Sequence, residues 1–315
     1  MAKKKKSTEL KEAIEARLEA LSALTDEARI SEEMQTYLQF LGRFHRYSFN
    51  NAMLILMSNP DATLVAGYRK WQGVGFQVRK GEKGIPILAP ICHGNSKKDT
   101  ADATKEMVIE VESESESDKG QTRTGLWFRT VYVFDVSQVG IPCPQCKTLA
   151  AHDATQCPEC GSELDVSLPQ PPEWINEGED GVGLAVRLQS YAQSLGIEVS
   201  ESDLPGTRQG ESHIGKVVLR EGLSPLGRAS ILAHEIAHEL LHTEKDRQML
   251  SRTIKETEAE ATAYAVCAHF GHEITSPNYI AMWSGDSSLL QQRMNRISKA
   301  AKQIIEAITE GGFVQ

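Results

Sequence analysis

One run of twelve residues constrains the C-terminal half of this chain more than any other feature. Residues 231–242 read Ile-Leu-Ala-His-Glu-Ile-Ala-His-Glu-Leu-Leu-His, with His234 and His238 four positions apart. Apolar residues recur around them at helical spacing: Leu232, Ile236, Ala237, Leu240 and Leu241. We therefore expect a helix packed into a core. Such a helix places both imidazoles on one face, where one Zn²⁺ can bind them, and puts Glu235 where it can take a proton from the water that zinc activates.

A second segment offers a third zinc ligand. Residues 255–264 read Lys-Glu-Thr-Glu-Ala-Glu-Ala-Thr-Ala-Tyr, which predicts an Ala-rich helix with Glu256 and Glu260 one turn apart. Zinc hydrolases with a Glu ligand have this layout, so we expect Glu256 to bind the metal. Glu260 is expected to orient a ligand histidine through its free N–H, and it is the alternative ligand. Glu258 lies about 200° round the helix from Glu256, so we expect it to be a solvated charge.

Two alternatives for the third zinc ligand, His242 and the third histidine of a longer motif, are excluded. His242 is rotated by about 80° from His234 on a helical wheel, so we expect a histidine at the helix C-terminus, near the metal but not bound to it. The longer motif HExxHxxGxxH needs Gly at position 241 and His at position 244, where this chain has Leu241 and Glu244. The competing interpretation, a surface helix with two ordinary histidines, conflicts with the apolar flanks.

Four of the six cysteines form a second metal-binding pattern. They stand in two short turns, Cys143-Pro-Gln-Cys146 and Cys157-Pro-Glu-Cys160. Two such turns complete a tetrahedral Cys₄ site, and closed sites of this kind are structural. The sequence therefore predicts a second Zn²⁺ in a small ribbon that follows a strand ending at Phe134. Cys92 and Cys267 stand alone and are expected to be buried small apolar residues.

Composition and termini narrow the class of protein. A chain of 315 residues predicts two domains. No run of 18 apolar residues occurs, so no transmembrane helix or membrane partner is expected. The start Met-Ala-Lys-Lys-Lys-Lys lacks the apolar region of a secretory signal. Together with paired cysteines that suit metal binding in a reducing compartment, these features predict a cytoplasmic protein.

Charge is distributed unevenly along the chain. The formal net charge of the whole is −9. Residues 43–83 nevertheless hold seven basic and two acidic residues, a net charge of +5: Arg43, Arg46, Arg69, Lys70, Arg79, Lys80 and Lys83 against Asp61 and Glu82. Much of the acidity lies elsewhere, including residues 110–118. This asymmetry suggests an anionic partner for the N-terminal half only.

The pattern along the chain predicts an α+β protein. We expect helices over 1–59, short strands and turns over 62–92, a strand over 126–134 and a strand over 214–220, with helices over 182–196, 226–243 and 254–309. The predicted domains are an α+β N-terminal domain (1–140, with an acidic flexible insert at 93–124), the inserted zinc ribbon (141–167), a linker (168–180) and a mostly helical zincin-like domain (181–315).

Aromatic and basic residues interleave in residues 42–87. The aromatic members are Phe44, Tyr47, Phe49, Tyr68, Trp71 and Phe76. Rings that stack on bases, beside cations that follow phosphates, are typical of single-strand binding with little sequence preference. The competing interpretation is that the rings are core residues and the cations ordinary solvated charges.

Four motifs in the N-terminal half resemble a known family. They are Phe44-His-Arg-Tyr-Ser-Phe-Asn-Asn51, Gly67-Tyr-Arg-Lys-Trp71, Gly75-Phe-Gln-Val-Arg-Lys-Gly-Glu-Lys-Gly84 and Val133-Phe-Asp-Val-Ser-Gln138. They resemble the N-terminal domain of ArdC-type antirestriction proteins, which implies a single-stranded-DNA-binding domain. The positions that match the family's motifs are Arg46, Tyr47, Ser48, Asn50, Asn51, Trp71, Arg79, Lys80 and Lys83.

The C-terminal half resembles the metallopeptidase domain of the same family. The resemblance rests on the motif at 234–238, on the Glu-rich helix and on Tyr279-Ile-Ala-Met-Trp283. This zincin-type domain is related to metallopeptidases of the ImmA/IrrE type. The family is carried by plasmids and other mobile elements to evade host restriction. The chain departs from the common pattern in its Cys₄ ribbon and its acidic insert, and the resemblance excludes residues 93–124 and 141–172.

Three functions follow as alternatives. The first is an antirestriction-type metallopeptidase that binds single-stranded DNA and acts on a protein or peptide, with zinc at both sites. The second is a regulatory protease of the ImmA/IrrE type that cleaves a repressor, with the N-terminal domain recognising protein. The third is a non-catalytic protein that shields DNA, with zinc in a purely structural role. In the first two, residues 214–220 would form the strand edge along which a peptide lies extended.

Overall fold

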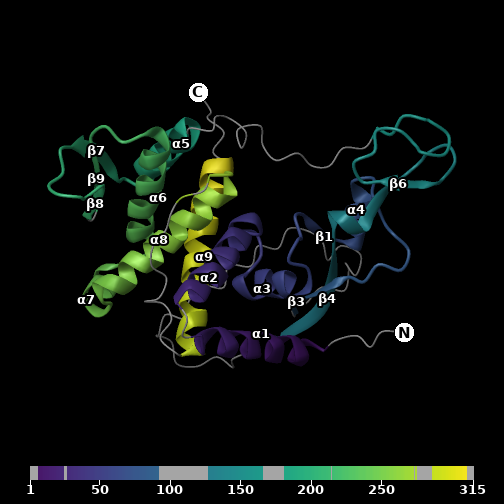
Figure 1. Ribbon diagram of the computed structural model, residues 1–315, viewed down its shortest axis with the longest axis horizontal. Helices are drawn as coiled ribbons and strands as arrows, with labels where there is room; N and C mark the ends of the chain where they lie inside the picture. Colours follow the sequence, from purple (N-terminus) through teal and green to yellow (C-terminus); the bar gives the residue numbers. More distant parts are fainter. Residues whose placement is uncertain are drawn as a thin grey trace, which may run out of the picture. The chain divides into compact units, whose positions relative to one another are not determined.

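The computed structural model describes residues 6–24, 27–91, 127–165, 181–213, 215–272, 274 and 286–310 (Figure 1). Contacts divide the chain into two compact units. The first unit comprises residues 1–13 and 54–169, and the second comprises residues 14–53 and 170–315. The contacts thus group residues 14–53 with the C-terminal half, whereas the sequence places them in an N-terminal domain ending at residue 140. The predicted acidic insert (93–124), the linker (168–180) and Cys92 lie outside the described residues.

The described helices are α1 (Ser7–Ser22), α2 (Glu27–Arg43), α3 (Phe49–Ser58), α4 (Tyr68–Gly73), the 3₁₀ helix η1 (Val136–Gln138), α5 (Val182–Ser194), α6 (Pro225–Leu241), α7 (Glu244–Met249), α8 (Arg252–His269) and α9 (Ser287–Glu310). The described strands are β1 (Val65–Gly67), β2 (Gln77–Val78), β3 (Ile85–Ile91), β4 (Trp127–Asp135), β5 (Val139–Pro142), β6 (Leu149–Ala151), β7 (Glu198–Ser202), β8 (Gly210–His213) and β9 (Lys216–Arg220). This mixture confirms the predicted α+β class. None of the described helices combines the length and apolar character that a membrane span requires.

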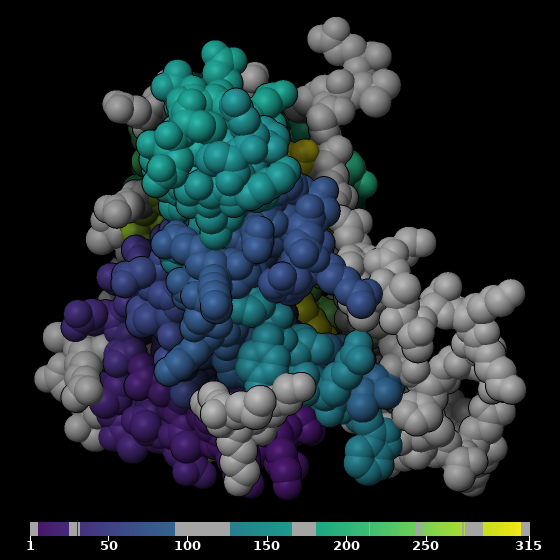
Figure 2. Space-filling model, turned by 90° about the vertical axis from the view of Figure 1, so that its right-hand side faces the viewer, coloured from purple at the N-terminus to yellow at the C-terminus, as the bar shows by residue number. Residues whose placement is uncertain are grey.

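The first unit is built on two three-stranded antiparallel sheets, with strand orders β1–β4–β3 and β2–β5–β6. Their shared core centres on Trp71, which is 1% exposed and whose indole Nε1 donates to the carbonyl of Phe134 at 2.9 Å. The same cluster continues through Val139 and Ile141 to Cys143 and Cys157. The cysteine-rich segment is therefore part of this core and not a separate appendage. In Figure 2 its teal residues stand directly above the blue residues that precede Ile91.

One predicted element of the first unit is wrong. Residues 62–92 were expected to hold only strands and turns, yet Tyr68–Gly73 forms the helix α4. The glycines suggested turns, but Gly73 ends this helix, and Gly75, at φ +88°, reverses the chain towards β2. Burial of Trp71 on one face of the short helix stabilises it against its low intrinsic helix propensity.

The second unit packs helices around α6. Helix α6 lies between α5 and α8, α9 closes the bundle, and the sheet β7–β9–β8 lies beside α6 (Figure 1). Small side chains line the crossing of α6 with α8 and α9, where Ala237, Leu241, Ala259 and Ala300 form one buried cluster. Interaxial distance depends on the side chains at the contact, so the alanines at three of these four positions let the helices approach closely.

Helix α2 packs on α8 through a glycine. A Cβ at Gly42 would come within 2.4 Å of the carbonyl oxygen of Ala265, so only glycine allows this approach. The carbonyl oxygen of Gly42 lies 3.3 Å from Nδ1 of His45 and 2.9 Å from Nδ1 of His269. The two rings touch, with centroids 4.7 Å apart. Burial lowers the pKa of both histidines, that of His45 to about 3.

This buried histidine pair predicts acid sensitivity. The pKa of His45 is about 3 in the folded chain, whereas an ordinary solvated histidine has a pKa of 6.5, so between these values the unfolded chain binds the extra proton. The free energy of unfolding should therefore fall as the pH drops below 6.5, by up to about 1.4 kcal/mol per pH unit for this group. Urea titrations at a series of pH values measure the slope. His45→Asn keeps an N–H donor for Gly42 but does not titrate, and equal slopes for it and the wild type would contradict the assignment.

Candidate metal centre

Helix α6 places the two histidines of the predicted site. Ser224 caps its N-terminus by accepting from the amide of Gly227, and Pro225 opens it without the loss of a hydrogen bond. The apolar face is buried against α5 and α8, which leaves His234 and His238 on the side towards α8. Their Nε2 atoms lie 3.0 Å apart, so both nitrogens point at one spot.

Helix α8 supplies Glu256 to the same spot. Ser251 caps this helix by accepting from the amide of Ile254, which sets Glu256 in its second turn. Its Oε2 lies 3.4 Å from Nε2 of His234 and 3.6 Å from Nε2 of His238. Atoms bound at about 2.0–2.1 Å around a tetrahedral ion lie about 3.4 Å apart, so this donor set fits a divalent metal with a fourth position open. The three predicted ligands are thus brought together.

The electrostatics of this site favour a ligating carboxylate. Hydrogen bonding to His234 and His238 holds the pKa of Glu256 far below its usual range. Burial lowers the pKa of His238. Burial also acts to lower the pKa of His234, but there the hydrogen bond to Glu256 and the charges of the neighbouring carboxylates together outweigh burial and raise the pKa. Glu235 differs, because burial raises its pKa to about 7. A carboxyl with a pKa near neutrality is suited to accept a proton and release it again.

The strand beside Glu235 corrects one expectation. The order β7–β9–β8 makes β9 the central strand, so residues 216–220 cannot offer the open edge that the sequence suggested. The strand next to the site is β8, at the edge of the sheet. Glu239 on α6 holds it by accepting from Ser212 at 2.7 Å and from the amide of Gly215 at 3.1 Å. At Gly210 a Cβ would come within 2.7 Å of Oε1 of Glu235, so glycine brings the strand against the carboxyl.

The expectation for Glu258 is also wrong. Glu258 is not solvated but 1% exposed, and its Oε2 lies 3.2 Å from Nε2 of His242. His242 is the C-cap of α6, as predicted, and is 2% exposed. Its Nδ1 lies 3.0 Å from Nδ1 of His238. The rotation between His234 and His242 does not reveal this contact, but His242 stands one helical turn after His238, and that spacing indicates it.

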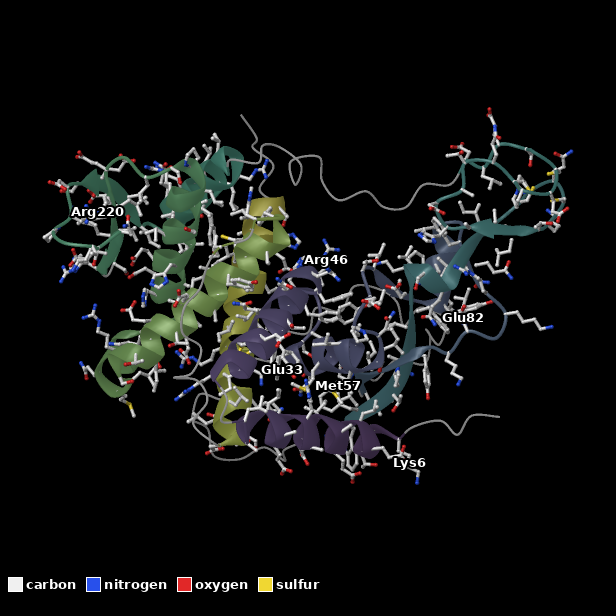
Figure 3. The ribbon with its side chains drawn as sticks, viewed as in Figure 1. Lys6, Glu33, Arg46, Met57, Glu82 and Arg220 are labelled. Carbon is white, nitrogen blue, oxygen red and sulfur yellow. The ribbon has the colours of Figure 1, made fainter. Side chains whose placement is uncertain are left out.

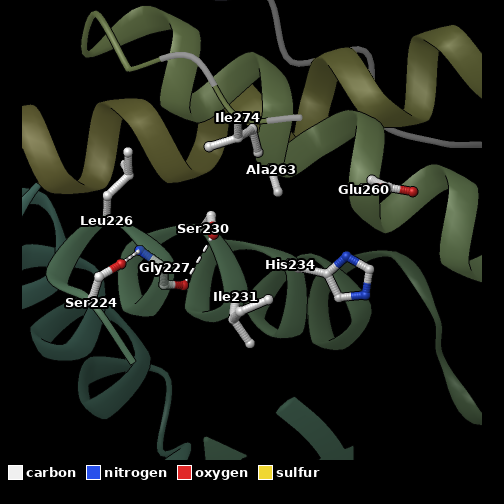
Figure 4. Close-up of a pocket in the computed structure, with 9 residues that line it drawn as sticks. All are labelled: Ser224, Leu226, Gly227, Ser230, Ile231, His234, Glu260, Ala263 and Ile274. Carbon is white, nitrogen blue, oxygen red and sulfur yellow. Dashed lines mark hydrogen bonds between the residues drawn. The ribbon is translucent and has the colours of Figure 1, made fainter. Parts of the chain in front are cut away.

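Glu260 lies in a hollow beside His234. The hollow has a volume of about 320 Å³ and follows the N-terminal half of α6, with Ile231 and Ala263 among its apolar residues (Figure 4). Ser230 at its polar side donates to the carbonyl of Gly227 at 3.0 Å. The carboxylate of Glu260 contributes to the raised pKa of His234. Its predicted role in orienting a ligand histidine stays a prediction.

The four cysteines converge as the sequence predicts. Sulfur atoms of Cys143 and Cys160 lie 3.6 Å apart, and those of Cys146 and Cys157 lie 3.4 Å apart. A tetrahedral ion with metal–sulfur bonds of about 2.3 Å separates its sulfurs by roughly 3.8 Å, close to these values. The Ser162 hydroxyl lowers the pKa of the Cys143 thiol to about 5, which favours the thiolate that a metal requires.

The two cysteine turns repeat one backbone design. The amide of Cys143 donates to the carbonyl of Thr148, and the amide of Cys157 donates to that of Ser162, both at 2.9 Å. The residue after the second cysteine of each turn has positive φ, +65° at Lys147 and +69° at Gly161. The same hydrogen bonds and the same left-handed position present two thiolates from each turn to one point.

The residues assigned to DNA fall in both units. In the second unit, Arg46 (labelled in Figure 3) and Ser48 are exposed, while Tyr47 and Asn50 are half-buried. Ser48 accepts from the amide of Asn51 and so caps α3, and Asn50 accepts from the side chain of Gln291 at 3.1 Å. Ser48 and Asn50 thus have hydrogen-bond partners within the protein, and these contacts give both residues a structural role.

In the first unit the structure corrects the role of Trp71. Its buried ring is a core residue, and its faces are not open to a base. The exposed ring on the same helix is Tyr68, at 46% exposure, followed by the exposed Arg69 and Lys70. Among the aromatic residues of 42–87, Tyr68 is the one that a surface criterion selects.

The basic turn after β2 is tied to the segment before β5. Arg79 donates to the carbonyls of Ser137 and Val139, and Gln138 donates to the carbonyl of Lys83 and to Glu82, the residue labelled in Figure 3. Arg79 therefore has a structural role, although it is exposed. Lys80 and Lys83 are exposed and remain the candidates for phosphate contact.

Comparisons with known proteins fall on both halves of the chain. The family model for the N-terminal domain of anti-restriction factor ArdC matches residues 4–134, and that for the IrrE N-terminal-like domain, a peptidase family, matches residues 192–268. An uncharacterised protein of Bacillus anthracis is 23% identical over 306 residues, which covers 91% of this chain and 50% of that protein. The chain thus spans about half the length of this curated relative.

Two solved structures are also similar. Both are crystal structures of the antirestriction ArdC protein from the R388 plasmid. The metal-free one is 18% identical with a TM-score of 0.44, covering 84% of this chain and 85% of that one. The Mn(II)-bound one is 17% identical with a TM-score of 0.43, covering 84% and 89%.

The donor sets predict two metal ions per chain. His234→Ala should remove one equivalent and leave the other, and Cys143→Ser with Cys146→Ser should remove the second independently. The Cys₄ ion should resist chelators longer, because closed coordination leaves no position for the chelator to enter. Elemental analysis of the purified variants, checked for folding by circular dichroism, measures both. A His234→Ala variant with the full metal content of the wild type would rule out the histidine site.

Proposed function

The chain combines the N-terminal domain of anti-restriction factor ArdC with an IrrE N-terminal-like peptidase domain, and we propose that it is an antirestriction-type zinc metallopeptidase that binds single-stranded DNA. The observation that carries the catalytic half is the convergence of His234, His238 and Glu256 beside a buried Glu235. Two imidazoles and one carboxylate suit Zn²⁺ in a catalytic site that keeps one position open. A second Zn²⁺ at the four cysteines would be structural.

Glu235 is the proposed general base. Bound zinc would acidify a water molecule and polarise the substrate carbonyl. The buried Glu235 carboxylate would accept the proton of the attacking water and later give it to the leaving amine.

The peptide is proposed to lie along β8. This strand is at the edge of its sheet, and Gly210 brings its backbone against Glu235. An extended peptide can add to such an edge through backbone hydrogen bonds, which aligns it without reading its sequence. The hollow beside His234, with Ile231 and Ala263 in its wall, is suited to an apolar side chain of that peptide.

Replacing the proposed base tests catalysis. Glu235→Gln keeps the size of the side chain and the metal ligands but cannot accept the proton, so hydrolysis of fluorescently labelled casein should fall by about 10²–10⁴-fold. Zinc content and DNA binding should be unchanged. Gln292→Ala, an exposed substitution on α9 away from β8, serves as the control for purification and assay. Equal turnover by wild type and Glu235→Gln would remove Glu235 from the mechanism.

DNA binding is proposed for the exposed basic surface of the first unit. The candidates there are Lys80 and Lys83 for phosphates and Tyr68 for stacking on a base, with Arg69 and Lys70 beside it. Arg46 and Tyr47 in the second unit stay proposals for the same partner. Single strands should bind in preference to duplex, because only unpaired bases expose their faces to an aromatic ring.

The basic turn predicts a salt-dependent affinity. Lys80→Ala/Lys83→Ala, with Arg79 left in place to hold the turn, should weaken binding to a labelled oligothymidine. It should also lower the salt slope by about 1.4, since each phosphate contact on a single strand contributes roughly 0.7. Lys216→Ala/Lys299→Ala removes the same charge from the second unit and should leave the slope unchanged. If both double variants bind with the wild-type slope, this turn is not the DNA site.

A second candidate function rests on the match to the IrrE N-terminal-like domain. In that case the chain cleaves a regulatory protein such as a repressor, and the first unit recognises the protein substrate. Loss of casein cleavage in Glu235→Gln together with no binding of oligothymidine by the wild type would favour this function. A chain that binds DNA but has no hydrolytic activity would instead be a shielding protein with structural zinc.

A further inference from the structure

A chain of buried polar groups runs behind the proposed zinc site. From the geometry we infer that His242 and Glu258 are positioning residues: they hold the proton of His238 on Nδ1, so that its Nε2 lone pair faces the metal. This inference rests on the proposed zinc site, and it assigns a task to two residues that the metal ligands leave without one.

The contacts form one continuous path across three helices. Nδ1 of His238 lies 3.0 Å from Nδ1 of His242, and Nε2 of His242 lies 3.2 Å from Oε2 of Glu258. The path ends at Arg296 on α9, whose Nη2 lies 3.6 Å from the same carboxylate oxygen. The side chains of His242 and Glu258 are only 1% and 2% exposed, so water does not compete for these hydrogen bonds.

The chemistry of the groups fixes the direction of the path. A carboxylate only accepts, so Nε2 of His242 must carry a proton and donate to Glu258. In a neutral imidazole the other nitrogen is then an acceptor, so Nδ1 of His242 accepts from Nδ1–H of His238. With its proton on Nδ1, His238 presents a bare Nε2 at the point shared with His234 and Glu256.

The opposite arrangement is inconsistent with the same contacts. If Nδ1 of His242 carried the proton, its unprotonated Nε2 would face the Glu258 carboxylate, lone pair against lone pair. His238 would then hold its proton on Nε2, aimed at His234 and at the metal position. With Glu258 ionised and His242 neutral, only the first arrangement gives the His238–His242 and His242–Glu258 contacts a donor and an acceptor each and leaves a metal ligand.

Burial explains why the anchor needs a carboxylate and an arginine. A carboxylate removed from water is strongly destabilising unless it is paired and hydrogen-bonded. Glu258 has both kinds of partner, the His242 imidazole and the Arg296 guanidinium, which also donates to the carbonyl of Leu241 at the end of α6. The contacts of Glu258 therefore connect α6, α8 and α9. Because His242 is held in this way, it fixes the orientation of the His238 ring.

Two substitutions of similar size separate positioning from packing. His242→Asn keeps an oxygen that can accept from Nδ1–H of His238, whereas His242→Leu fills the space and accepts nothing. Co²⁺ is titrated into protein whose histidine site has been stripped with a chelator while the Cys₄ site retains zinc, and the visible absorption of bound Co²⁺ gives the affinity. Thermal unfolding of the stripped proteins reports the packing separately.

We expect His242→Leu to bind Co²⁺ about 10–100-fold more weakly than the wild type, the usual cost of losing a partner of a ligand histidine. His242→Asn should stay within a few-fold of the wild type, although both variants lose the imidazole. Wild-type affinity in His242→Leu, or equal losses in both variants, would overturn the inference. If the wild type itself binds no Co²⁺ at this site, the proposed zinc site is wrong, and so is the positioning role of His242 and Glu258.

Discussion

The close crossing of α6 with α8 is the contact on which the rest of the second unit depends. The buried cluster where the helices meet holds three alanines, Ala237, Ala259 and Ala300, beside Leu241. Because the backbones approach closely, Glu256 on α8 reaches the histidines of α6, and Glu258 reaches the end of the same helix. A bulkier residue at position 259 would push α8 away from α6. It would thereby separate Glu256 from His234 and His238 without replacing any of these side chains.

In the first unit, the two cysteine turns are connected to both the hydrophobic core and the basic turn. Cys143 follows β5 directly, and β5 pairs with β2 and lies in the core that contains Trp71. The segment at the start of β5 also binds the basic turn at 79–83 through Arg79 and Gln138. A metal at the cysteines would therefore stabilise the base of the surface proposed to bind DNA, which gives the ribbon a role beyond its own fold.

Local patterns in the sequence predicted the local parts of the site well. Spacing within a helix determined that His234 and His238 share a face, and the two CxxC turns predicted a four-sulfur cluster. Contacts between elements were harder to predict. Glu258 looked solvated because a helical wheel shows direction but not what lies there, and here it meets His242 and Arg296. Trp71 looked like a stacking residue because composition does not distinguish a core ring from a surface ring. The placement of β8 at the sheet edge depends on strand order, which no single strand reveals.

We propose that one chain holds two metal ions in chemically different sites. X-ray diffraction from crystals of the zinc-loaded protein, collected on both sides of the zinc absorption edge, tests it directly. We predict two anomalous peaks, one within about 2.0–2.2 Å of the ligand atoms of His234, His238 and Glu256, and one about 2.3 Å from each of the four sulfurs. A single peak at the cysteines, with the imidazoles of α6 turned away from each other, would contradict it.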